Sequence, residues 1–70
     1  MGRKILKSKR ALLGLTQVDI ASKLGINIKS YNLKENGKVK FKLEEVVAVS
    51  KILNLTLDEV DEIFLNIKKI

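Results

Sequence analysis

The segment LTQVDIASKLGINIKSYNLKENGK, residues 15–38, decides the fold because it predicts two short helices joined by a tight turn. Thr16 and Asp19 have the spacing of a capping box, in which side-chain oxygens accept hydrogen bonds from the free backbone N–H groups of a helix start. Gly25 follows the apolar positions of this helix, and a residue without a Cβ readily takes the left-handed conformation that turns the chain. The pattern predicts a helix over about residues 17–24.

A second helix is predicted over about residues 28–36, because Asn27 is a good N-cap and Gly37 ends the pattern. Two helices joined by a short turn that contains Gly form a helix-turn-helix, whose second helix lies in the DNA major groove. Helical spacing turns Tyr31 and Glu35 away from the side that faces a partner. The residues expected to read bases are Asn27, Ile28, Lys29, Asn32 and Leu33.

The remaining chain predicts three more helices, which support the first two. They cover about residues 3–13, 43–53 and 57–65, and a short apolar and basic tail follows at 66–70. In the fourth helix, the apolar stripe expected to face the core consists of Leu43, Val46, Val47, Ser50 and Leu53, and Val49 and Ile52 widen the apolar face beyond it. We therefore predict an all-α fold of five helices in one domain, residues 1–70.

The composition excludes several kinds of chemistry. The 70 residues include no Cys and no His, which rules out disulfides, zinc sites of the usual kind and His-based catalysis. No glycine-rich phosphate loop occurs, and the acidic residues of the last two helices are expected at helix starts and on the surface. We expect no enzyme activity, cofactor, metal or small-molecule ligand. No stretch approaches the roughly 20 apolar residues of a membrane span, so a cytoplasmic location is expected.

Charge is divided unequally along the chain. Residues 1–42 contain 11 basic and 2 acidic residues, a net charge of +9, whereas residues 43–70 contain 3 basic and 6 acidic residues, a net charge of −3. The half that contains the helix-turn-helix is therefore the half suited to DNA phosphates. A lysine-rich surface that only meets water is the alternative.

The whole pattern resembles the lambdoid phage repressor and Cro family, part of the larger Xre-type group of bacterial and phage regulators. The resemblance extends to about Phe64 and rests on KSKR at 7–10, LGL at 13–15, LTQ at 15–17, Ala21, Gly25, Ser30 and ENGK at 35–38. The sequence KENGKVKFKLEE at 34–45 further resembles a variant found in small regulators of phages and mobile elements. The resemblance implies a lambda-repressor-like domain that binds double-stranded operator DNA, usually an inverted repeat, as a repressor.

The resemblance also implies roles for individual residues. An arginine at position 10 would pair with Glu35, and the basic residues of the first helix would lie near the DNA backbone. Ala21, Gly25, Tyr31 and Glu35 would maintain the motif. The residues expected at the DNA backbone are Lys9, Arg10, Gln17, Ser30, Asn36, Lys38 and Lys40. Lys34 departs from the family pattern at an inner position, where its stem is expected to cover apolar surface while its ammonium reaches water or phosphate.

Two alternatives stay open at this point. The apolar tail either folds back over the core or joins the fifth helix in a homodimer interface. The recognition helix could also meet a protein instead of DNA, as in an antitoxin-like or anti-repressor module that uses Ile28, Tyr31 and Leu33. The high lysine content of the first half argues against a protein-binding module as the only role.

Overall fold

Helices make up all the regular structure that the computed structural model describes, which covers residues 2–65 and 67, with side chains from residue 4 onward. The helices are α1 (Gly2–Leu12), α2 (Gln17–Leu24), α3 (Ile28–Glu35), α4 (Leu43–Ile52) and α5 (Leu57–Val60), and α5 continues into a π-helical turn, Asp61–Leu65. The described residues contain no strand. The all-α class and the five helices are therefore confirmed. Over the same part of the chain, no helix has both the length and the apolar character needed to cross a membrane.

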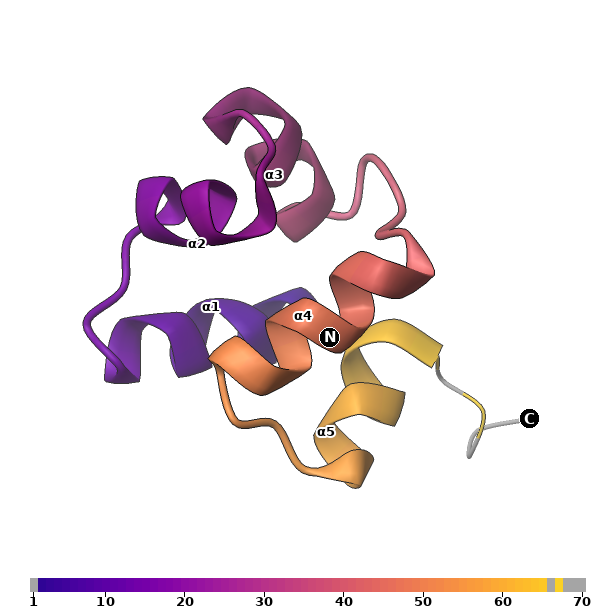
Figure 1. The fold of residues 1–70 in the computed structure, drawn as a ribbon. Helices are drawn as coiled ribbons and strands as arrows, with labels where there is room; N and C mark the ends of the chain where they lie inside the picture. Colours follow the sequence, from indigo (N-terminus) through magenta and orange to yellow (C-terminus); the bar gives the residue numbers. More distant parts are fainter. Residues whose placement is uncertain (1, 66, 68–70) are drawn as a thin grey trace.

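The helices pack in two groups around one core (Figure 1). α2 and α3 lie against each other at the top of the view, above α1 and α4, and the π-helical turn packs against α1. The buried core side chains come from α1 to α4 and the residue that follows α4: Leu6, Ile20, Ala21, Tyr31, Val49 and Leu53. This packing supports α3 from one side only and leaves its other side at the surface of the molecule.

The helices of the motif begin at the predicted residues; α2 ends at Leu24 as predicted, and α3 ends at Glu35, one residue before the predicted end. Thr16 and Asp19 form the expected capping box, with the Asp19 backbone N–H donating to Thr16 Oγ1 at 3.1 Å and the Thr16 N–H donating to Asp19 Oδ2 at 2.8 Å. Gly25 has a φ of 72°, the left-handed conformation that ends α2. Asn27 caps α3, and its Oδ1 accepts from the Ser30 N–H at 2.7 Å. Local capping chemistry thus accounts for the tight turn.

The predicted inward stripe of α4 is wrong in part. Leu43 and Val47 are 74% and 48% exposed, whereas Glu45 is only 8% exposed. Leu53 of the stripe and Val49 of the wider apolar face are buried, as expected. Two of the positions predicted to face inward are therefore exposed, and Glu45 faces inward instead. The physical reason is an ion pair: the Glu45 carboxylate turns inward because the ammonium of Lys34 meets it there, as described below.

The fifth helix also differs from the continuous α-helix expected over 57–65. Its α-helical part has four residues, and the next five have π-helical hydrogen bonding. Of the tail at 66–70, only Ile67 is described. Its backbone N–H donates to Asp61 Oδ1 at 2.8 Å, and its side chain is 60% exposed. The prediction for the rest of the tail lies outside the described residues.

Candidate nucleic-acid interface

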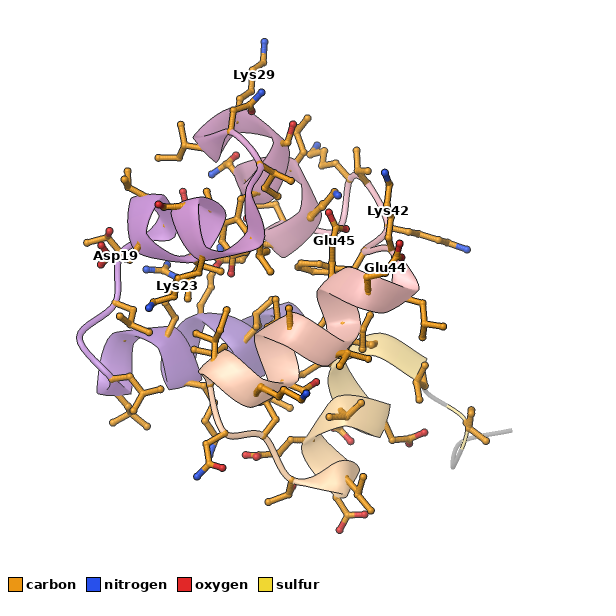
Figure 2. The ribbon with its side chains drawn as sticks, viewed as in Figure 1. Asp19, Lys23, Lys29, Lys42, Glu44 and Glu45 are labelled. Atoms are coloured by element: carbon orange, nitrogen blue, oxygen red, sulfur yellow. The ribbon has the colours of Figure 1, made fainter. Side chains whose placement is uncertain are left out.

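The outer side of α3 carries the residues expected to read bases. Asn27, Ile28, Lys29 and Asn32 are exposed, and Leu33 is half-buried beside them. Lys29 projects from the start of α3 away from the rest of the molecule (Figure 2). The structure therefore brings these five residues together on one accessible helix face. The Oδ1 of Asn27 is engaged in the cap, so its NH₂ group is the part left for a partner.

The inner side of α3 is anchored by Tyr31 and Glu35, which are 0% and 1% exposed. The Tyr31 ring packs edge-on against Phe41, with 6.2 Å between ring centroids, and Phe41 packs edge-on against Phe64 at 5.1 Å. These contacts tie the recognition helix to the loop that follows it and to the π-helical turn. The expected structural role of Tyr31 and Glu35 agrees with this placement.

Glu35 is the centre of a buried hydrogen-bond cluster that includes the expected pair with Arg10. Arg10 donates through Nε to Glu35 Oε2 at 2.9 Å and through Nη2 to Oε1 at 3.1 Å. Tyr31 Oη donates to Oε2 at 2.7 Å, and Gln17 Nε2 donates to Oε1 at 2.9 Å. A carboxylate has about four lone-pair positions, so these four donors satisfy it fully.

This cluster keeps Glu35 ionised although it is buried. Burial by itself raises the pKa of the Glu35 carboxyl, but hydrogen bonds from Arg10, Gln17 and Tyr31 outweigh burial and hold that pKa below its ordinary value. The same contacts raise the pKa of Arg10, chiefly through its hydrogen bonds to Glu35. Burial and the hydrogen bond to Glu35 raise the pKa of Tyr31, so its hydroxyl stays a donor. The cluster therefore connects three helices: α1 through Arg10, the start of α2 through Gln17, and the end of α3 through Glu35.

Gln17 lies between this cluster and the outer face of α3. Its Nε2 donates to Glu35, and its Oε1 accepts from Asn32 Nδ2 at 3.1 Å. The sequence predicted a Gln17 amide directed at phosphate and gave no sign of these two contacts. Because an amide NH₂ has two hydrogens, one N–H of Gln17 remains for a phosphate at the start of α2.

Lys34 makes a second buried ion pair, which sequence reasoning missed. Its Nζ lies 2.6 Å from both carboxylate oxygens of Glu45, and the two side chains are 9% and 10% exposed. Glu45 Oε1 also accepts from the Lys42 backbone N–H at 2.7 Å. Burial raises the pKa of Glu45, but the hydrogen bonds from Lys34 and Lys42 outweigh it, and the net shift is downward. The expectation that the Lys34 ammonium reaches water or phosphate, and that Glu45 is a surface acid, is therefore wrong.

Basic residues after α3 extend the candidate interface. Lys38 and Lys40 are exposed in the connection to α4. Lys42 is exposed too, and its ammonium points to the side of the molecule where α3 lies (Figure 2), although sequence reasoning did not select it. Ser30 is half-buried in the first turn of α3, and Asn36 Nδ2 donates to the Asn32 carbonyl at 2.9 Å.

The two basic residues of α1 that were expected at the DNA backbone are engaged within the protein. Lys9 Nζ lies 2.9 Å from Glu59 Oε2, which is on α5 and not on the helix-turn-helix. Arg10 donates to Glu35 and, through Nη1, to the Leu15 carbonyl at 3.0 Å. We therefore leave both out of the candidate interface, because their cationic groups already have partners in the described part of the chain.

A helix-turn-helix with an accessible second helix and a lysine-rich flank defines a DNA-binding protein of the regulator class. The comparison with protein families agrees: the helix-turn-helix family HTH_3 matches residues 6–60, and the chain belongs to this Xre-type family. Searches of curated proteins and of solved structures gave no significant match.

Proposed function

We propose that this protein is a sequence-specific double-stranded DNA-binding repressor of a phage or mobile element, acting in the cytoplasm. The observation that carries the proposal is the outer face of α3, where polar and apolar side chains are accessible on a helix held rigidly from behind by Glu35. In the proposed complex, α3 enters the major groove. Lys29 donates to the acceptors of guanine, and Ile28 or Leu33 contacts a thymine methyl.

The proposed backbone contacts surround this helix. Lys38 and Lys40 reach phosphates beside α3, and the remaining N–H of Gln17 binds a phosphate together with the free N–H groups at the start of α2. Ser30 and Asn36 add contacts at the two ends of α3. These contacts position the protein without reading sequence.

We further propose a homodimer that binds an inverted repeat. Leu65 and Ile67 are 48% and 60% exposed, and these two apolar side chains are suited to contact with a second copy. Removal of residues 66–70 should lower the mass measured by sedimentation at micromolar concentration. An unchanged mass would rule out the role of the tail.

The test of the function is selection of bound duplexes from a random pool at about 0.15 M salt, which weakens non-specific binding. We expect enrichment of two inverted half-sites about one helical turn apart. A single enriched half-site would retain the function and reject the dimer. No enrichment by the folded protein would reject sequence-specific binding.

Two substitutions separate the proposed roles. Lys38→Ala should weaken binding to all duplexes and lower the slope of log K against log salt by about 0.9. Lys29→Ala should change base preference at one position by about 1 to 3 kcal/mol. If both variants weakened specific and random DNA equally, the assignment of base-reading and backbone contacts would be wrong.

The second candidate is a protein-binding module, favoured by Ile28, which is 46% exposed on the recognition helix. The burial of Tyr31 removes one of the three side chains expected to contact such a partner. Capture of one stoichiometric host protein after nuclease treatment, together with failure of the duplex selection, would favour this candidate.

A further inference from the structure

Three side chains form a hydrogen-bonded series from the buried cluster to the outer face of α3. Glu35 Oε1 accepts from Gln17 Nε2 at 2.9 Å, and Gln17 Oε1 accepts from Asn32 Nδ2 at 3.1 Å. Glu35 is at the end of α3, Gln17 begins α2, and Asn32 is exposed on α3. A buried carboxylate is thereby connected to a side chain that faces the proposed DNA.

The chemistry of the carboxylate dictates which way each amide is turned. An ionised carboxylate only accepts hydrogen bonds, so Gln17 must direct its NH₂ group toward Glu35. The Gln17 oxygen then faces Asn32, which must direct its own NH₂ group toward that oxygen. Reversing the Gln17 amide would place its oxygen against the Glu35 carboxylate, where neither group can donate. The orientation of the Asn32 amide is thus set by Glu35, through Gln17.

This orientation decides which hydrogen-bonding groups Asn32 offers to a base. Within the described residues its Oδ1 has no partner, and one hydrogen of its NH₂ group is not directed at Gln17. An acceptor next to a donor matches adenine, which presents the N6 amino group and the N7 acceptor in the major groove. Guanine presents acceptors at both places, so its O6 would oppose the Asn32 oxygen.

We propose that Gln17 is a positioning residue that determines base specificity: it holds Asn32 in the orientation that accepts adenine and rejects guanine. This inference rests on the proposed function, because it requires α3 to lie in the major groove. It assigns Gln17 a role in selectivity in addition to its contact with phosphate. Asn32 touches the base, and Gln17 acts through Asn32.

The test compares Gln17→Met with Asn32→Ala and with the double variant. Methionine has nearly the length of glutamine and no amide, so it removes the two hydrogen bonds while filling similar space. Val18→Ala is the control, since Val18 is the next residue of α2 and is 56% exposed. Thermal unfolding of each variant identifies those that are folded at the assay temperature. Affinity is measured for operators that carry each of the four bases at every position of the half-site.

Wild-type protein should prefer adenine at one position, and Asn32→Ala should reduce that preference by about 5- to 100-fold, the range of a bidentate base contact. Gln17→Met should raise affinity for guanine relative to adenine at the same position by about 2- to 10-fold, because an unrestrained amide must be ordered on binding and can turn its NH₂ group outward. In the double variant, the added effect of Gln17→Met on base preference should disappear. Val18→Ala should leave the preference at that position unchanged.

Three results would overturn the inference. The first is that Gln17→Met weakens every duplex equally and keeps the adenine preference, which would make Gln17 a phosphate contact only. The second is that Asn32→Ala leaves every base preference unchanged, which would exclude Asn32 as a base-reading residue while the proposed function stands. A wild-type protein without any base preference would overturn the proposed function and this inference together.

A measurement without DNA covers the case in which Gln17→Met does not fold. In the wild-type protein, nuclear Overhauser effects should connect the side-chain NH₂ protons of Asn32 with the γ protons of Gln17. An Asn32 NH₂ group that shows no such contact in the folded protein would also overturn the inference.

Discussion

Replacing Arg10 by Met tests whether the buried carboxylate of Glu35 holds the recognition helix in place. The substitution removes two of the four hydrogen bonds to Glu35, whose side chain is 0% exposed, and the bond to the Leu15 carbonyl. Met preserves most of the apolar stem. What is lost is therefore the guanidinium and its charge.

The expected cost is large for a domain of this size. Removing one partner of a buried ion pair costs about 3 to 5 kcal/mol, because the other charge stays buried without compensation. A chain of 70 residues has a total stability of only about 4 to 10 kcal/mol. At about 4 to 8 °C per kcal/mol, the melting temperature of Arg10→Met should fall by at least about 12 °C.

Lys9→Met provides the matched control for this experiment. Lys9 is the neighbouring residue of α1 and also forms one ion pair, but the side chains of Lys9 and Glu59 are 33% and 23% exposed. Water stabilises the remaining charge there, so the loss should be much smaller. Thermal and urea unfolding followed by circular dichroism would measure both variants. Equal losses would refute the reasoning that burial makes the Arg10 pair important.

The difference in stability between wild type and Arg10→Met should depend on pH, and the direction follows from the pKa of Glu35. In the wild-type protein the pKa of Glu35 is below its ordinary value of 4.5, so the stability that Glu35 provides is present above pH 4.5 and is lost as pH falls through the lowered pKa. Arg10→Met raises the pKa of Glu35 relative to wild type, because burial then has fewer opposing hydrogen bonds. The stability difference between wild type and Arg10→Met should therefore narrow below pH 4.5. A difference that stays constant down to the lowest pH at which both proteins fold would contradict this account.

Three other perturbations have definite expectations. Gly25→Ala should destabilise the domain by about 1 to 2 kcal/mol in urea unfolding, because a φ of 72° disfavours any residue with a Cβ. The cost comes from the backbone alone, since no neighbour lies within 4 Å of an added Cβ. An unchanged stability would show that the turn relaxes. Lys34→Met should cost about 3 kcal/mol by leaving Glu45 buried without its partner, and adding Glu45→Leu should recover part of that loss; additive losses would exclude the pair. Glu35→Gln should reduce the loss of stability at acidic pH, measured by unfolding followed by circular dichroism at a series of pH values. An unchanged loss would show that other carboxylates cause it.

Local chemistry in the sequence was enough to predict where the motif helices begin and end. Capping depends on residues three positions apart, so Thr16 with Asp19 and Asn27 with its helix could be recognised directly. The burial of Ile20 and Ala21 follows from helical periodicity in the same way. Capping and periodicity agree in α2, and this agreement made the helix-turn-helix predictable.

Contacts between helices could not be predicted on the same basis. Lys34 and Glu45 are 11 positions apart on different helices, so no local pattern pairs them. Lys34 was expected at an inner position with its ammonium at water or phosphate, and Glu45 was expected on the surface. Glu45 faces Lys34 in the buried ion pair, and Leu43 and Val47, which periodicity had placed inside, are exposed. The link from Gln17 to Asn32 depends on the angle between α2 and α3, which no pattern of single residues encodes. The Arg10–Glu35 pair was expected only through the resemblance to known repressors.

The separation between the two sides of α3 has a consequence for engineering. Ile28 and Lys29 are exposed and make no side-chain hydrogen bond to the rest of the described protein, so they can be randomised together in a library with little loss of folded clones. Leu33 is half-buried, so it is best varied among apolar residues only. Asn32 is different, because exchanging it also removes a partner of Gln17. Under the proposed base contacts, a library that varies these three residues in this way and keeps Asn32 should change operator preference at the positions assigned to them and keep the base assigned to Asn32 as an internal standard.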